Sequence, residues 1–573
     1  MPESTDSIAL RALADRLWSH LRAGDPYLAQ RAGDPVTRLP HGTPEEAQDD
    51  AAFGRRLLAE ISALSEKDSD LAVVVGEYAR KLARADNDYW WTFPVAPYQT
   101  YPWSLYRQQV FEPFTFADGG DVSRYLSLVD DFAKTLDAAR GKLVAQAENG
   151  IALPRPALPG FLATIRAHRA AAADYLRVDE ARATGLGAAT RGNLRDDVER
   201  IVDGEVLPAF DRLLDHLTGP GAERAIEGVG LHQYAGGEDA YRALVRQYAT
   251  YDISPERVHE LGLEQVAQLT EQLADIRRAA GFTGDEAAYR AVLQADDRFH
   301  APDAESVAST YRRHISAIEP RIGEWFSVLP KAEYGVQRLD AALEAGMSYG
   351  YYEPPVASNV VGSYRFNGSG LDSRAQISAA ALILHELVPG HHFHLARQAE
   401  DTGLHPLQAQ AAPAEFGAYT EGWAEYAASL GFEMGAYDDP WDAYGACVHQ
   451  RFVAQRLVVD TGLNLMGWPL EKAREYMASM TMESPAQVAS ETLRYATDMP
   501  GQCLGYRLGA TKFWQLRREA EQELGAAFDV REFHEVVLGS GTLPLTAVER
   551  NVAAYIAGRS ASPVPDRRSG RSG

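Results

Sequence analysis

The chain has 573 residues, of which 46% are hydrophobic and 24% are charged, as is typical of a soluble globular protein. This length permits several domains or one large enzyme and excludes a small fold that depends on disulfides or a metal. The 56 basic and 80 acidic residues give a formal net charge of −24. Because such a field repels phosphate backbones and anionic lipids, we expect neither a nucleic-acid partner nor a membrane partner.

The cellular location is predicted from cysteine usage and from the apolar segments. Cys447 and Cys503 are the only cysteines, too few for a disulfide framework, which fits a reducing compartment. Charged residues interrupt the apolar pattern of the first 21 residues, so we find no signal-peptide core. No uncharged apolar run approaches the ~20 residues of a membrane span. We therefore predict a cytoplasmic protein.

In chain order, the apolar periodicity predicts a mainly α-helical protein. The clearest helix covers 254–281, where Ser254 is a cap, Pro255 suits the first helical position and Gly281 ends the helix. Three short segments rich in aromatic and β-branched residues are expected to be strands of one small sheet, immediately before the residues with the clearest chemistry. The predicted helices are 6–23, 46–87, 122–147, 190–217, 254–281, 303–328, 439–466 and 502–525, and the predicted strands are 334–339, 347–352 and 361–367.

The most informative motif is ALILHELVPGHHFHLARQ, which places His385, Glu386, His391 and His392 within eight residues. In zinc hydrolase helices, two histidines one turn apart bind the metal and the glutamate between them is the general base. Here the residue four after His385 is Pro389, which cannot bind a metal and disrupts a helix. The motif therefore predicts a zinc site with an interrupted helix.

The second histidine ligand depends on how the chain bends at Pro389 and Gly390. An unbroken helix would turn His391 by about 240° from His385, away from a shared ion. If the two residues are an insertion in a His-Glu-x-x-His turn, His391 returns to the metal side. His392 lies nearly on the same face as His385 but about 10.5 Å further along the helix. We predict His391 as the ligand and keep His392 as the alternative.

A carboxylate is expected as the third ligand, with an open position for water. The segment AEFGAYTEGWAEYAASL places Glu421 and Glu425 four residues apart, on one face of a helix. We predict Glu421 as the ligand and Glu425 as the carboxylate that hydrogen-bonds a ligand histidine, with Glu425 as the alternative ligand. The cluster thus predicts one Zn²⁺ per chain, with Glu386 as the general base.

Several motifs resemble those of the bacterial DUF885 family, itself similar to helical zinc carboxypeptidases and other gluzincin-type metallopeptidases. The resemblance runs from about residue 10 to 555. Its most specific part maps onto His385, Glu386, Pro389, Gly390, His391 and His392, and Glu-Gly-Trp-Ala maps onto 421–424. The supporting strings are DPYLAQRAGDPVTRLP, GYYEPP, HELVPGHH, TEGWAEY, RLVVDTGL and RYATDMPGQCLGYRLG.

The resemblance implies a large helical, zincin-like body with a deep cleft and hydrolysis of peptide or related amide bonds. We expect a helical N-terminal half, 1–235, that covers the cleft, a catalytic zinc-binding half, 236–559, and a disordered tail, 560–573. The expected partner is a short peptide or an amide-containing small molecule. The sequence predicts no oligomeric state.

The resemblance also implies which residues assist catalysis. Tyr506 and, as an alternative, Tyr495 are candidates to donate a hydrogen bond to the oxyanion. Relatives are expected to carry Asp-Thr-Gly-x-His where this chain ends the motif with Asn464, which favours a specialised substrate. Arg494 and Arg507, and also Lys512, are candidates for binding a substrate carboxylate.

The glycine-rich segment 361–370, VGSYRFNGSG, is predicted to be an edge strand beside the cleft that pairs with the substrate through its main chain. Tyr364, Arg365 and Asn367 are its candidate substrate-binding residues. Two alternatives to a peptidase remain open: a zinc hydrolase for one biosynthetic amide, and an inactive metal-bound peptide-binding protein. Because binding alone needs no general base, Glu386 argues against the second.

Overall fold

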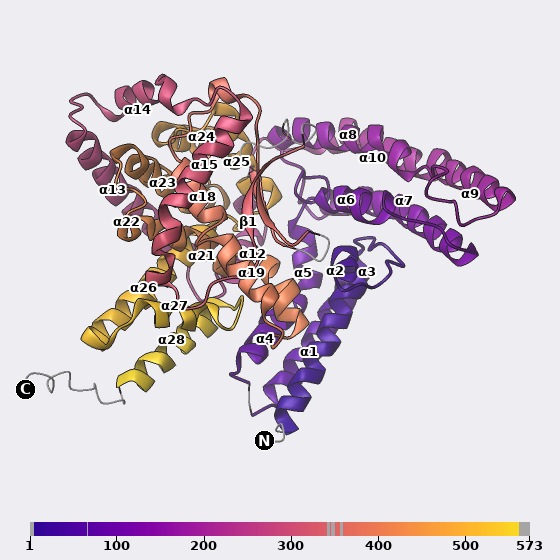
Figure 1. The fold of residues 1–573 in the computed structure, drawn as a ribbon. Helices are drawn as coiled ribbons and strands as arrows, with labels where there is room; N and C mark the ends of the chain where they lie inside the picture. Colours follow the sequence, from indigo (N-terminus) through magenta and orange to yellow (C-terminus); the bar gives the residue numbers. More distant parts are fainter. Residues whose placement is uncertain (1–4, 66, 341–343, 345–349, 356–358, 561–573) are drawn as a thin grey trace, which may run out of the picture. The chain divides into compact units, whose positions relative to one another are not determined.

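The computed structural model describes residues 5–65, 67–340, 344, 350–355 and 359–560. It is mainly helical and contains one three-stranded sheet among these residues, which confirms the predicted mainly α-helical class with a small sheet (Figure 1). The chain divides into two compact units. The first comprises residues 1–244, 462–474 and 489–501, and the second comprises residues 245–461, 475–488 and 502–573.

The first unit is helical, with an aromatic core. The Trp103 ring meets the rings of Phe132 and Phe210 edge-on, with centroids 6.1 Å apart in each case. Its helices are α1 (Thr5–Gly24), α2 (Pro26–Arg31), α3 (Pro44–Ser62), α4 (Asp70–Leu82), α5 (Ala85–Asp88), α6 (Tyr101–Leu105), α7 (Gly119–Glu148), α8 (Leu158–Leu176), α9 (Ala188–Ile201), α10 (Leu207–Thr218) and α11 (Pro220–Arg224). Helices α12 (Gly237–Ala249), α23 (Pro440–Asn464), α24 (Leu470–Met480) and α25 (Pro485–Leu493) carry the chain between the units.

The second unit contains the His-Glu motif and the sheet. Its helices are α13 (Pro255–Ala279), α14 (Glu286–Gln294), α15 (Ala304–Ile318), α16 (Ile322–Trp325), α18 (Ala379–Glu386), α19 (His391–Glu400), α20 (Ala412–Glu415), α21 (Gly417–Ser429), α22 (Gly431–Met434), α26 (Leu504–Leu524), α27 (Val530–Leu538) and α28 (Leu545–Ser560). Its strands are β1 (Tyr334–Arg338), β2 (Gly350–Glu353) and β3 (Gly362–Phe366).

Three predicted helices are wrong in their continuity. The range 303–328 is divided into α15 and α16 by a 3₁₀ turn at Glu319–Arg321. The range 46–87 contains two main helices, α3 and α4, because Ser69 caps α4 by accepting a hydrogen bond from the Ala72 amide. The two helices pack so closely that a Cβ on Gly54 would lie 2.3 Å from the Ala83 nitrogen. The range 190–217 is interrupted by a π-helical turn at 202–206 between α9 and α10. Apolar periodicity alone does not detect any of these breaks.

The sheet has the strand order β1-β3-β2, with β1 parallel and β2 antiparallel to β3. Tyr364 of β3 pairs with Val336 on one side and Tyr352 on the other. The prediction of an edge strand at 361–370 is therefore wrong, because β3 is central and both of its edges are hydrogen-bonded. The strand predicted at 347–352 corresponds to β2, although its residues 347–349 lie outside the described residues.

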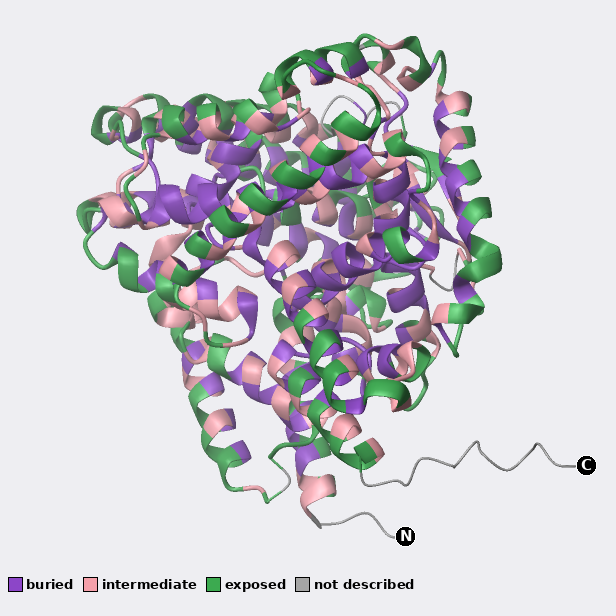
Figure 2. Ribbon diagram, turned by 90° about the vertical axis from the view of Figure 1, so that its left-hand side faces the viewer, coloured by how far each residue is buried: buried purple, intermediate pink, exposed green. Residues whose placement is uncertain are grey.

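Helix α21 lies at the centre of the second unit, packed against α18, α19 and α26. A Cβ on Gly422 would lie 2.4 Å from the Gly509 Cα of α26, so the two helix backbones are in direct contact. Figure 2 shows that many helices carry buried and exposed residues on the same ribbon. Glu421 and Glu425 are thus carried by a helix that its neighbours hold tightly.

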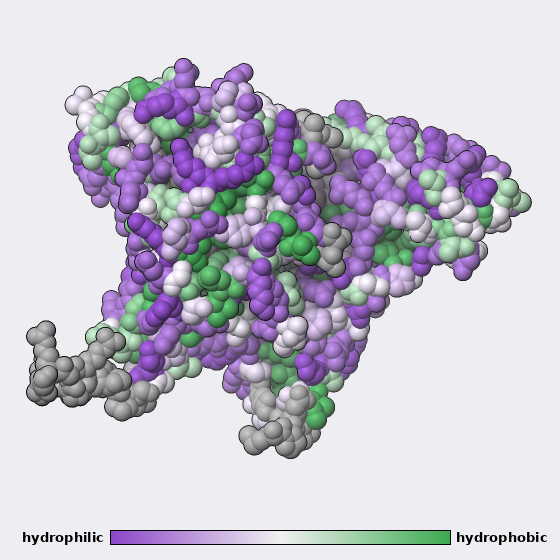
Figure 3. Space-filling model, viewed as in Figure 1, coloured by the Kyte–Doolittle hydropathy of each residue, from purple (hydrophilic) through white to green (hydrophobic). Residues whose placement is uncertain are grey.

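Hydrophilic residues cover most of the face visible in Figure 3, in keeping with the many charged residues. Within the described part of the chain, no helix combines the length and the apolar character that crossing a membrane requires.

Candidate metal centre

The break predicted inside the His-Glu motif is present. Helix α18 ends at Glu386 and α19 begins at His391. Gly390 passes so close to the preceding helix that a Cβ there would lie 1.9 Å from the His385 carbonyl oxygen. The Trp423 indole of α21 donates a hydrogen bond to the Pro389 carbonyl oxygen at 3.0 Å. This turn brings the rings of His385 and His391 to a centroid distance of 4.7 Å.

The predicted ligands His385, His391 and Glu421 lie together. Glu421 Oε2 is 3.5 Å from His385 Nε2 and 3.3 Å from His391 Nε2, and the three ligand atoms lie within 4.8 Å of one another. Zinc bonds of about 2.0–2.1 Å in a tetrahedral arrangement separate two ligand atoms by about 3.3 Å. The donor set and its spacing therefore fit a tetrahedral zinc ion with one open position.

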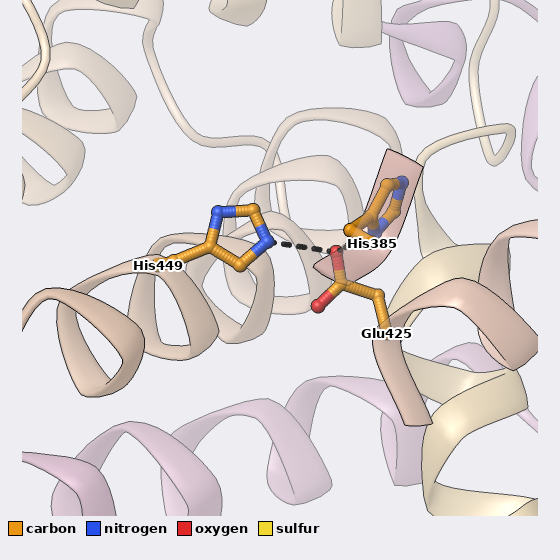
Figure 4. A group of neighbouring side chains, drawn as sticks. All are labelled: His385, Glu425 and His449. Carbon is orange, nitrogen blue, oxygen red and sulfur yellow. Dashed lines mark hydrogen bonds and ion pairs between the residues drawn. The ribbon is translucent and has the colours of Figure 1, made fainter. Parts of the chain in front are cut away.

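Glu425 lies where the supporting carboxylate was predicted. Its Oε1 is 3.1 Å from His385 Nδ1 and 2.9 Å from His449 Nε2. Figure 4 shows the Glu425 carboxylate between the rings of His449 and His385. A carboxylate bonded to Nδ1 fixes the ring orientation and leaves Nε2 for a metal.

His385, Glu425 and His449 form a second group with metal-binding geometry. Their nitrogen–oxygen distances of 2.9 and 3.1 Å are ordinary hydrogen-bond lengths and are shorter than the spacing that a tetrahedral zinc imposes. We therefore interpret this group as the hydrogen-bonded support of His385.

His449 was missed by sequence analysis, because it is a single histidine 24 residues beyond Glu425. One signal was available. Helix α23 carries polar side chains at fully buried positions, including Arg451, Gln455 and Asp460, and a buried polar helix face usually supports a site or an ion-pair network.

His392, the alternative ligand, is engaged elsewhere. The Tyr352 hydroxyl donates to His392 Nδ1 at 2.9 Å, and His392 Nε2 donates to the Ala332 carbonyl oxygen at 3.1 Å. Burial lowers the pKa of His392 to about 4, so the ring is neutral at physiological pH. Both nitrogens are occupied, and His392 joins β2 and the chain before β1 to α19.

We expect His391→Ala to abolish stoichiometric zinc binding and His392→Ala to retain one zinc per chain. The reason is that only His391 shares the Glu421 oxygen with His385. Elemental analysis of the purified variants after dialysis measures this, with circular dichroism to show that both are folded. Zinc loss in His392→Ala together with full zinc in His391→Ala would reverse the assignment.

The pKa shifts of two glutamates in the cluster suit two different roles: Glu421 that of a ligand for a cation, and Glu386 that of a proton acceptor. Burial acts to raise the pKa of Glu421, but His391 and His385 together hold it well below its usual value. Burial raises the pKa of the Glu386 carboxyl, although His385 and His391 oppose the shift. A carboxylate with a raised pKa exchanges protons more readily near neutral pH.

A cavity of about 720 Å³ in the second unit contains this cluster. Glu386 and Tyr506 line it together with the three predicted ligands. The Tyr506 ring is nearly parallel to the His385 ring, with centroids 6.4 Å apart. The Arg456 guanidinium carbon lies 4.8 Å from the Tyr506 ring centroid. Packing between a histidine and an arginine thus fixes the orientation of Tyr506.

Three other predicted site residues belong to the first unit and are engaged there. The Tyr495 hydroxyl donates to Glu491, and Arg494 forms an ion pair with the same carboxylate at 3.0 Å. Asn464 donates to the Tyr495 carbonyl oxygen at 2.9 Å and accepts from the Leu231 amide at 3.1 Å. Asn464 therefore joins backbone segments of its own unit.

The remaining candidates lie in the second unit, mostly in structural contacts. Arg507 donates to Gln265, and Lys512 forms an ion pair with Glu549 at 3.0 Å. Tyr364 is fully buried and packs edge-on against Tyr311. Arg365 pairs with Glu353 at 2.6 Å. Asn367 lines the cavity, and its amide donates to the Glu344 carbonyl oxygen at 2.7 Å.

A family model described as "Bacterial protein of unknown function (DUF885)" matches residues 26–552. The chain belongs to the DUF885 family. The match covers both units, including the whole His-Glu cluster. No curated protein matches the chain.

Two solved structures are similar to this DUF885 protein. One is of a "putative lipoprotein" from Colwellia psychrerythraea, with a TM-score of 0.84, 24% identity, and coverage of 97% of this chain and 100% of that chain. The other is of a "putative lipoprotein of unknown function" from Shewanella oneidensis, with a TM-score of 0.72, 16% identity, and coverage of 96% and 99%. At these identities the likeness shows a shared fold.

Proposed function

We propose that the protein is a zinc-dependent hydrolase that cleaves peptide or related amide bonds, with a gluzincin-like arrangement of its ligands. The observation that carries the proposal is the Glu421 oxygen 3.3–3.5 Å from one nitrogen of each histidine, beside the half-buried Glu386 in the same cavity. This donor set of two histidines and one glutamate is that of catalytic zinc sites.

A zinc ion held by His385, His391 and Glu421 would supply a water with a pKa near 7 and polarise the substrate carbonyl. Glu386 accepts the proton released when the water oxygen bonds to the carbonyl carbon. The same carboxylic acid returns the proton to the amide nitrogen as the carbon–nitrogen bond breaks. The Tyr506 hydroxyl donates a hydrogen bond to the carbonyl oxygen while it carries negative charge.

A zinc hydrolase for one small biosynthetic amide is the second candidate. The observation that favours it is Asn464, which stands where relatives are expected to have a histidine and which bonds two backbone segments of the first unit. An inactive peptide-binding protein is less favoured, because Glu386 lines the cavity without being one of the predicted ligands.

The test is digestion of a random hexapeptide library by the zinc-loaded protein, followed by mass spectrometry. We expect cleavage products that disappear after chelation and return with added zinc, because the metal supplies the nucleophile. His391→Ala is the matched inactive control. Cleavage that persists in the chelated protein and in His391→Ala would contradict the proposal. Absence of cleavage together with turnover of one small amide would favour the second candidate.

We also propose a cytoplasmic location, on the basis of two buried cysteines that form no disulfide. The two similar structures come from proteins described as putative lipoproteins, a description that suggests a location outside the cytoplasm. Fractionation of the native host into cytoplasmic and membrane fractions tests the proposed location.

A further inference from the structure

Arg374 lies in the wall of the cavity that contains the His-Glu cluster, and its guanidinium has no hydrogen-bond or ion-pair partner among the residues that the structure describes. It follows the 3₁₀ turn Leu371–Ser373, shortly before α18, and lines the same cavity as the metal cluster. Among the described residues, none forms a hydrogen bond or ion pair with its guanidinium. Other arginines of this region are paired: Arg338 with Glu344 at 2.7 Å and Arg365 with Glu353 at 2.6 Å.

The acidic groups near Arg374 form no ion pair with it, although the hydrogen bond from Arg338 and, to a lesser extent, the charge of Arg374 lower the pKa of Glu344. The Glu344 carboxylate accepts hydrogen bonds from Arg338 Nε at 2.7 Å, Arg338 Nη2 at 2.9 Å and the Gly368 amide at 2.8 Å. Asp372 also lines the cavity but forms no ion pair with Arg374. A half-buried guanidinium loses hydration, and a carboxylate replaces that hydration best through two parallel hydrogen bonds.

The cavity extends along α18 between the region of Arg374 and the His-Glu cluster. Ser378, Leu382 and His385 line the cavity along one side of the α18 segment, so the cavity extends about 10 Å along this helix at 1.5 Å per residue. Arg374 precedes the start of this row, and Glu386 ends it. Burial raises the pKa of Tyr311, on which the charges of Glu386 and Arg374 act in opposite directions, so both groups lie near the Tyr311 hydroxyl.

We propose that Arg374 binds a carboxylate of the substrate, so that the enzyme prefers short substrates with a free carboxylate on the side of the cavity where Arg374 lies. An extended peptide rises about 3.3 Å per residue, so the stretch of about 10 Å along α18 accommodates about three residues. The carboxylate is either the C-terminus of a short peptide or an acidic side chain. This inference rests on the proposed hydrolase function and names its substrate class.

The test compares Arg374→Gln with the wild type on two pairs of peptide libraries. The first pair consists of random hexapeptides with a free or an amidated C-terminus. The second pair consists of amidated hexapeptides in which one position is fixed as glutamate or glutamine. We expect the wild type to prefer the carboxylate member of one pair, and we expect Arg374→Gln to lower kcat/KM for that member by about 10–100-fold, as for loss of a charged hydrogen bond.

The pair that shows the effect identifies the source of the carboxylate. Hydrolysis of the neutral members should change little in Arg374→Gln, and Arg374→Lys should restore part of the preference. Arg298→Gln is the matched control, because this exposed arginine is already paired with Asp296 at 2.6 Å. Equal hydrolysis of both members in both pairs would overturn the inference while leaving the proposed function intact.

A binding measurement distinguishes failure of the proposed Arg374 subsite from failure of the proposed hydrolase function. The zinc-loaded Glu386→Gln protein is mixed with each library and bound peptides are identified after gel filtration, in the presence and absence of the Arg374→Gln substitution. Arg374-dependent enrichment of the carboxylate peptides without any hydrolysis by the wild type would support the subsite and contradict the hydrolase. No enrichment and no preference in hydrolysis would overturn the subsite.

Discussion

Replacement of Glu386 by glutamine is expected to lower turnover by about 10²–10⁴-fold, the usual contribution of a general base, while the protein keeps its zinc. Glutamine has nearly the same size but cannot accept a proton from water. Glu386 lies next to His385 in the chain without being one of the three predicted ligands, so its carboxylate is not needed to hold the metal. Elemental analysis and steady-state kinetics on the best library peptide measure the two properties separately.

Glu400→Gln is the matched control for this variant. Glu400 lies in α19 and accepts hydrogen bonds from the Lys331 and Ala332 amides, away from the predicted ligands. Its replacement should leave turnover within about two-fold, as for most substitutions outside a site. Near-normal turnover in Glu386→Gln would exclude Glu386 as the base, and loss of zinc in that variant would identify it as a ligand instead.

Replacement of Tyr506 by phenylalanine is expected to lower kcat and kcat/KM together by about 10²–10³-fold, with zinc content unchanged. The hydroxyl is proposed to bond the oxyanion, which exists only after attack on the carbonyl. Because the ring remains packed on His385 and beside Arg456, the variant removes the hydroxyl with little change in packing. An equal loss in kcat and kcat/KM marks an interaction made in the transition state.

Tyr352→Phe removes another hydroxyl that lines the same cavity and serves as the matched control. That hydroxyl already donates to His392, so its loss should reduce kcat far less than the loss at Tyr506. A rise in KM alone in Tyr506→Phe would make Tyr506 a binding residue. A slow Tyr495→Phe beside a normal Tyr506→Phe would transfer the role to Tyr495.

The sequence alone was sufficient to predict the features that depend on residues close together in the chain. The helical class follows from apolar periodicity, and the break in the metal helix follows from Pro389 and Gly390, whose backbone restrictions act locally. The grouping of His391 with His385 could be predicted because the interruption is short. Glu421 and Glu425 were found because residues four apart share a face of any helix.

Features that depend on distant segments were decided only by the tertiary structure. The pairing of β3 on both sides, the separation of α3 from α4 and the partners of Asn464 each depend on residues far away in the chain. His449 and Arg374 are single residues that belong to no sequence motif. His449 was recognised because it hydrogen-bonds the Glu425 carboxylate, and Arg374 because it lines the cavity. A motif specifies which atoms can bind a metal, but long-range packing determines which side chains support the ligands and which charge remains open to the substrate.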